Sequence, residues 1–250
     1  MATPSEVLLS AFLVFCRVGG CILIAPGFSN SRIPATIRLY IAVAVSLALT
    51  PTLYASVLPL AIDATPASLF SAIGSETAIG LLIGLLGRLF FLALQSFAVV
   101  IAQSIGLGGM PGAMVDEGEQ LPALSTLLTV TATVMLFVTD QHWELLRGLV
   151  ASYGVMPPSA GFLPQFALAA VTDQLAEAFL IALRVASPFI VFSIIVNLAA
   201  GLVNKLTPTV PIFFVALPFF LAGGMLLLLF TVKELLAVFS GAVGSWLATG

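Results

Sequence analysis

Long apolar runs are the feature that most constrains how this chain can fold. The longest run, residues 69–105, contains no proline and would form a helix about 55 Å long at 1.5 Å per residue. A hydrocarbon core about 30 Å thick needs only about 20 apolar residues per crossing. The run is therefore either a hairpin bent near Gly84, Gly87 and Arg88 or one long helix that extends beyond the bilayer, and the sequence leaves both interpretations open.

Charged residues are too few to cover the surface of a soluble domain. They make up 8% of the 250 residues, whereas hydrophobic residues make up 60%, and an ordinary soluble domain carries about 25% charge. The eight Lys and Arg residues form no basic stripe, and the net charge is −3, which argues against a nucleic-acid partner. This composition indicates a multi-pass membrane protein with membrane lipid as its natural surroundings.

The other apolar runs are also continuous and do not alternate with polar residues. They cover residues 7–25, 37–58, 124–138, 167–204 and 212–247. In lipid, a backbone must satisfy its hydrogen bonds within its own segment or within a closed barrel, and continuous runs favour helices over a barrel. We therefore predict an all-α polytopic membrane protein of about six long helices arranged as hairpins, with residues 1–250 forming a single integral membrane domain and a kink at Pro188.

Ionisable side chains lie within these apolar runs. A charge in lipid costs at least about 2.5–3.5 kcal/mol, so each is expected to face protein or water. Glu177 and Arg184 share a helix face but lie about 10 Å apart along its axis, so they are expected to pair with other helices. Two explanations are open: these residues line a polar pathway or make subunit contacts, or they form structural pairs within the chain. They are Arg17, Glu76, Arg88, Asp173, Glu177 and Arg184, together with Lys205 from the polar link between the last two apolar runs.

Two local patterns suggest close packing and an irregular loop. Gly80 and Gly84 form a G-x-x-x-G pattern, which allows another helix to approach closely. Residues 106–122 are the most polar and glycine-rich stretch, and their composition alone favours an ordinary exposed loop over a gate. The candidate gate residues are Gly106, Gly108, Gly109, Met110, Pro111, Gly112, Met114, Val115, Asp116 and Glu117.

The titratable residues give no enzyme site. His142 lies near Asp140 and Glu144, but the chain has no G-x-S-G element to supply a nucleophile. We interpret the cluster as an interfacial polar cap anchored by Trp143. The two cysteines, at positions 16 and 21, are about 140° apart around a helix and cannot share a metal. No catalytic residue, metal or cofactor is predicted.

Three stretches together resemble the flagellar biosynthetic protein FliR family over roughly residues 7–230. It is their order and spacing that carry the resemblance, because no single motif is decisive. The matching positions are Arg17-Val18-Gly19-Gly20, Pro26, Ile33-Pro34, Arg38 and Pro51; Glu76 to Gly80, Gly84 and Ile101 to Gly106; and Ala182 to Pro188, Asn197, Gly201, Lys205, Pro208, Phe213, Pro218 and Gly224.

The resemblance implies a non-enzymatic subunit of the flagellar type III protein export gate in the bacterial inner membrane, at the flagellar basal body. Such a subunit would join the P, Q and B subunits, and the A subunit, in a helical hetero-oligomeric pore for unfolded export substrates. Residues 106–122 would match the plug loop of that pore. The resemblance therefore favours a plug at these residues, whereas their composition alone favours an ordinary exposed loop. The homologous injectisome type III secretion subunit is the alternative.

A secondary transporter is a more distant possibility. It would require an inverted repeat with helices broken at matching places. Arg17-Val18 and Arg184-Val185 are each followed by a basic residue shortly before a proline, but the spacings differ. We therefore favour the export gate.

Overall fold

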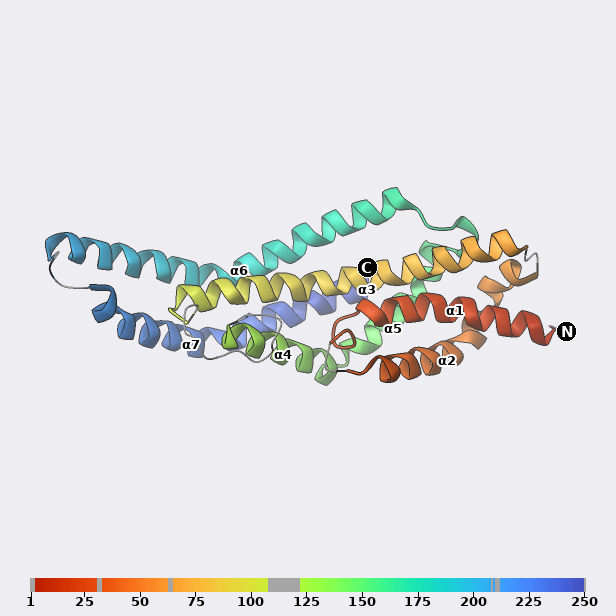
Figure 1. The fold of residues 1–250 in the computed structure, drawn as a ribbon, viewed down its shortest axis with the longest axis horizontal. Coiled ribbons are helices and arrows are strands. Elements are labelled where there is room, and N and C mark those ends of the chain that lie inside the picture. The colour runs from red at the N-terminus through yellow and green to blue at the C-terminus, as the bar shows by residue number, and fades with distance from the viewer. Residues whose placement is uncertain are drawn as a thin grey trace. The chain divides into compact units, whose positions relative to one another are not determined.

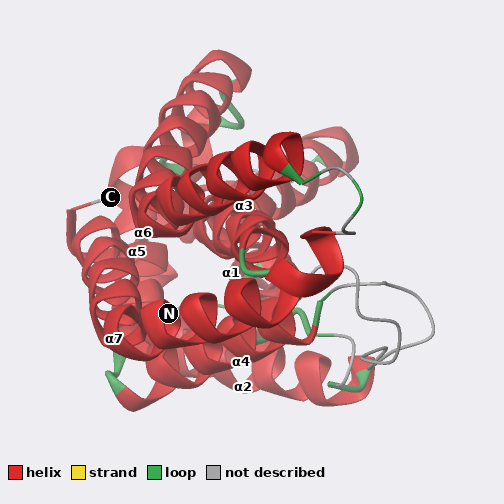
Figure 2. Ribbon diagram, turned by 90° about the vertical axis from the view of Figure 1, so that its left-hand side faces the viewer, coloured by secondary structure: helices red, strands yellow, loops and turns green. Residues whose placement is uncertain are grey.

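The computed structural model describes residues 3–30, 33–62, 65–107, 122–207, 209 and 212–249, and within these ranges it contains helices and loops but no strand (Figures 1 and 2). The all-α prediction is thus confirmed. Five helices are long and apolar enough to cross a membrane, and α4 with α5, bent by 72°, can form a sixth, broken span. In chain order the elements are α1 (Pro4–Ile24), α2 (Ala35–Ile62), α3 (Pro66–Ser104), α4 (Ala123–Val138), α5 (Gln141–Val155), the 3-10 turn η1 (Pro158–Ala160), α6 (Pro164–Leu206) and α7 (Ile212–Thr249).

The structure decides between the two interpretations of the longest apolar run. Helix α3 is continuous over 39 residues, so a hairpin at Gly84, Gly87 and Arg88 is excluded. A glycine within a helix costs only about 0.5–1 kcal/mol relative to alanine. The apolar surroundings and neighbouring helices are therefore sufficient to keep this helix intact.

Helix α6 also continues through its internal proline. Pro188 has no N–H to donate to the carbonyl oxygen of Arg184, four residues earlier. The hydroxyl of Ser187 donates to that carbonyl instead, at 2.8 Å. This substitution satisfies the freed acceptor within the helix, and a kink at Pro188 stays a prediction.

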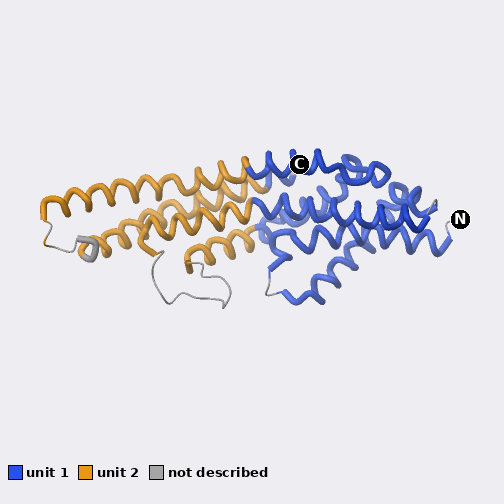
Figure 3. The backbone as a smooth tube through the Cα atoms, turned by 45° about the horizontal axis from the view of Figure 1, so that its top comes forward, with its two compact units in different colours: residues 1–89, 136–175, 244–250 blue, residues 90–135, 176–243 orange. Residues whose placement is uncertain are grey.

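The chain divides into two compact units (Figure 3). Unit 1 comprises Met1–Leu89, Leu136–Leu175 and Gly244–Gly250, and unit 2 comprises Phe90–Met135 and Ala176–Val243. Each unit is described by itself below. The expectation of a single integral membrane domain stays a prediction.

In unit 1, the backbones of α1 and α3 touch through glycines. A Cβ atom on Gly80 would lie 2.0 Å from the carbonyl oxygen of Arg17, and one on Gly84 would lie 2.6 Å from that of Cys21. On the facing helix, a Cβ atom on Gly20 would lie 2.7 Å from the carbonyl oxygen of Thr77. The close approach predicted from G-x-x-x-G is confirmed, and the helix that approaches is α1 of the same chain.

Replacement of Gly80 by alanine is expected to destabilise unit 1 by about 1–3 kcal/mol, because the new methyl group would overlap backbone atoms of α1. Gly74 is a matched control on the same helix, since nothing lies within 4 Å of its would-be Cβ atom. Gly74→Ala is expected to leave stability unchanged or raise it slightly. Thermal unfolding of the detergent-solubilised protein, followed by circular dichroism, compares the two. Equal unfolding temperatures for both variants would contradict the packing described here.

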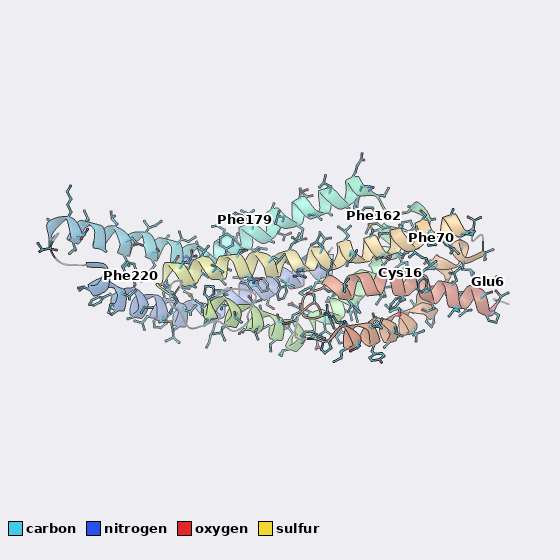
Figure 4. The ribbon with its side chains drawn as sticks, viewed as in Figure 1. Glu6, Cys16, Phe70, Phe162, Phe179 and Phe220 are labelled. Carbon is cyan, nitrogen blue, oxygen red and sulfur yellow. The ribbon has the colours of Figure 1, made fainter. Side chains whose placement is uncertain are left out.

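Apolar contacts complete the core of each unit. In unit 1, α1 packs on α2, and Ile79 and Leu82 of α3 form a buried cluster with Met156 and Ala167. In unit 2, aromatic rings join α3 to the two C-terminal helices. Phe91 meets Phe239 of α7 with ring centroids 5.3 Å apart, and Phe97 meets Phe179 of α6 at 5.1 Å; Figure 4 shows Phe179. Both units are thus held together by contacts between segments distant in sequence.

Candidate functional site

A fully buried ion pair joins α1 to α3 in unit 1. Nε of Arg17, on α1, donates to one carboxylate oxygen of Glu76, on α3, at 2.7 Å, and Nη2 donates to the other at 2.8 Å. Both residues have zero exposure. This bidentate geometry is the strongest form of an arginine–carboxylate ion pair. It lies beside the Gly80 contact, where the two helices are close enough for the side chains to meet.

Helix α5 and its C-cap residue, Met156, supply further partners of the arginine. Nη1 donates to the hydroxyl of Ser152 at 3.0 Å, and Nη2 donates to the carbonyl oxygen of Met156 at 3.0 Å. The guanidinium lies over the ring of Tyr153, 3.9 Å from its centroid, which is a cation–π contact. The Arg17 cluster, defined as these five residues, therefore joins α1, α3 and α5.

The Arg17 cluster has the features of a structural joint. Its charges cancel, and four of the five guanidinium N–H groups donate to protein atoms. Removing one partner would leave a buried, uncompensated charge. The sequence identified Arg17 and Glu76 as ionisable residues in apolar runs but contained no signal for their pairing, because 59 positions separate them.

The other ionisable residues of that set make no ion pair with any described part of the chain. Arg88 is half-buried, and four of them are exposed: Asp173, Glu177, Arg184 and Lys205. Glu177 and Arg184 do not contact each other, in agreement with their spacing along α6. Whether this set contacts other subunits stays a prediction.

The predicted plug falls mostly on residues 108–121, which lie outside the described residues, so the roles of Gly108, Gly109, Met110, Pro111, Gly112, Met114, Val115, Asp116 and Glu117 stay predictions. The end of α3 that leads into this segment is well defined. Gly106 has φ +83°, its N–H donates to the carbonyl of Gln103, and the N–H of Leu107 donates to that of Ala102. These two bonds form a Schellman motif, which stops the helix at a glycine that readily adopts positive φ.

Helix α7 covers this helix end within unit 2. Ile105 lies so close to Gly224 that a Cβ atom there would be 2.3 Å from the Cβ of Ile105. The α-carbon of Gly106 faces Leu217 and Phe220, the second of which is labelled in Figure 4. On the other side of the segment, α4 begins at Ala123, and the buried Ser125 donates to the carbonyl oxygen of Gln95 at 3.4 Å. Both flanks of the predicted plug are therefore packed within one unit.

The polar residues near His142 lie at the bend between α4 and α5. The imidazole lies 5.5 Å from the rings of Phe137 and of Trp143, and the indole is exposed. Asp140, which precedes α5, has φ +57°. Among the described residues, no three His, Cys, Asp or Glu side chains come together as a metal site. This arrangement offers aromatic packing at a bend.

Comparison with known proteins gives one consistent result. Residues 8–245 match the family described as "Bacterial export proteins, family 1". The chain is 32% identical to the flagellar biosynthetic protein FliR of Caulobacter vibrioides, over 96% of this chain and 94% of that protein. It is 27% identical to the protein of the same name from Escherichia coli, over 87% and 82%. It is also 27% identical to the Yop proteins translocation protein T of Yersinia pestis, over 70% and 68%.

Proposed function

Because the chain belongs to family 1 of the bacterial export proteins, we propose that it is a subunit of the flagellar type III protein export gate, in which it forms part of the pore and its plug. The observation that carries the proposal is the match over nearly the whole chain, residues 8–245, together with five long apolar helices. The flagellar biosynthetic proteins of Caulobacter vibrioides and Escherichia coli align over more of the chain than the translocation protein T of Yersinia pestis does. That difference favours the flagellar system over the injectisome alternative.

The surface of the single chain supports a role within an assembly. Only 22% of the most apolar stretch of α6 and 6% of that of α7 are buried, so most of these two stretches is available to lipid or to other subunits. Helix α6 also carries exposed charges, among them Asp173 and Lys205. Charges on an apolar helix are costly in lipid but not beside a polar partner. The P, Q and B subunits, and the A subunit, of the gate are the proposed partners, in the bacterial inner membrane at the flagellar basal body.

The proposed plug accounts for the unusual composition of residues 106–122. A closed gate must stop ions and still open for an unfolded polypeptide. A segment rich in glycine has few regular hydrogen bonds to break, so it can move at modest cost. Apolar side chains at Met110, Met114 and Val115 can close a narrow passage by excluding water.

Co-expression with the other membrane subunits of the flagellar export apparatus of the same organism tests the assignment. We expect a tagged chain to co-purify with them as one stable complex, and we expect deletion of its gene to abolish secretion of flagellar proteins into the medium. Re-expression of the chain should restore secretion. A chain that remains monomeric and transports a solute alone would contradict the proposal and favour a secondary transporter.

A further inference from the structure

The C-terminal end of α3 lies against one face of α7 within unit 2. Four residues of α7 form this contact surface, which we call the α7 seat: Leu217, Phe220, Leu221 and Gly224. They follow one another at positions i, i+3, i+4 and i+7 and therefore share one side of the helix. A Cβ atom on Gly106 would lie 3.6–3.8 Å from the first three side chains, which is ordinary van der Waals contact.

Gly224 brings the two backbones together. A Cβ atom there would lie 2.3 Å from the Cβ of Ile105 and 3.1 Å from its Cα, and Ile105 has zero exposure. Non-bonded carbon atoms in good contact are about 3.5–4.0 Å apart. The missing side chain at position 224 is thus what allows the end of α3 to lie this close to α7.

Helix α7 is less free to move at this level than the end of α3. Next to Gly224, the ring of Phe192 on α6 lies 3.0 Å from the position of a Cβ atom on Gly223. Gly224 is also well inside α7, whereas Ile105 directly follows Ser104, the last residue of α3. Helix ends lack part of the regular hydrogen bonding and open more easily than helix interiors. A side chain added at position 224 would therefore displace the end of α3.

The cap of α3 would carry such a displacement to the residues that follow. The N–H of Gly106 donates to the carbonyl of Gln103 at 3.1 Å, and that of Leu107 donates to the carbonyl of Ala102 at 2.8 Å. These two bonds tie Leu107 to the last turn of α3. The α7 seat thus fixes the place at which the chain leaves α3.

We propose that Gly224 is a positioning residue of the export gate, because it sets, through Ile105, the place from which the plug starts. This inference rests on the proposed function and deepens it. A hydrophobic constriction excludes water only while it is narrow. A plug that starts from a displaced point would leave the passage wider, although its own residues are unchanged.

Alanine at position 224 tests the proposal in the co-expressed complex. We expect Gly224→Ala to raise the ion leak per co-purified complex severalfold in planar bilayers. Gly223→Ala is the matched control, since it adds the same methyl group where the edge of the Phe192 ring can turn aside, and it should leave the leak at the wild-type level. A Gly224→Ala complex as tight as the wild type would overturn the proposal even if it unfolds at a lower temperature, because the contact would then serve stability alone. An equal leak from Gly223→Ala would overturn it as well.

Ile105→Ala tests the same contact if Gly224→Ala fails to assemble. It removes most of the side chain that meets Gly224 and adds no bulk, so the end of α3 is held less firmly. We expect this variant to co-purify with the other subunits and to leak more than the wild type. A complex with Ile105→Ala that stays tight would overturn the proposal.

A combined variant shows whether Gly224 acts through the plug. When Gly224→Ala is added to a deletion within residues 108–118, we expect no leak beyond that of the deletion alone, because the two changes would affect one element. Leaks that multiply would place the effect of Gly224 elsewhere in the pore and overturn the proposal. A deletion that assembles without leaking would instead contradict the plug of the proposed function, whereas a leaking deletion with a tight Gly224→Ala complex would contradict this inference alone.

Discussion

Replacement of Glu76 by alanine is expected to destabilise unit 1 by about 3–5 kcal/mol, because it leaves the Arg17 guanidinium buried without a counter-charge. Arg17 has zero exposure, so water cannot replace the carboxylate without opening the contact between α1 and α3. Ser152 and Met156 can retain their bonds to the arginine but cannot neutralise it. Thermal unfolding and limited proteolysis of the detergent-solubilised protein measure the loss.

A second variant distinguishes the cost of an unpaired charge from the loss of packing. Removing both charges with Arg17→Met/Glu76→Leu keeps the volume and leaves no buried ion, so most of the stability should return. Glu144→Ala removes the exposed partner of Arg147 and is expected to change stability by less than about 1 kcal/mol. If the double variant were no more stable than Glu76→Ala, the electrostatic explanation would be wrong.

Shortening residues 108–118 is expected to raise ion leak through the assembled gate severalfold, because the proposed plug would no longer span the passage. The flanks should tolerate the change, since the Gly106 cap and the start of α4 are packed independently within unit 2. Conductance of the purified complex in planar bilayers measures the leak. Co-purification of all subunits must be shown first, so that a leak is not confused with failed assembly.

Two substitutions at constant length show which side chains make the seal. Replacing Met110, Met114 and Val115 by glycine should raise the leak, because an apolar constriction excludes water and glycines do not. Asp116→Asn/Glu117→Gln should leave the leak unchanged, because charged side chains stay hydrated and so do not supply the water-excluding part of the proposed plug. A shortened variant that assembles and stays as tight as the wild type would rule out the plug.

Hydropathy alone determined most of the helical framework. The apolar runs 37–58 and 124–138 became α2 (Ala35–Ile62) and α4 (Ala123–Val138), with ends shifted by a few residues. This success has a physical cause: in an apolar solvent the backbone must bond within its own segment, so helix formation depends on local sequence. The glycine pattern at Gly80 and Gly84 likewise predicted a close helix approach, which needs only the absence of side chains.

Tertiary structure decided everything that depends on contacts between distant segments. The sequence could not choose between a hairpin and one helix for residues 69–105, and it could not pair Arg17 with Glu76. An ionisable residue in an apolar run indicates only that its side chain needs a polar neighbour, because a charge in apolar surroundings is costly wherever it lies in the sequence. Which neighbour meets that need depends on helix packing, which here brings Arg17 on α1 to Glu76 on α3.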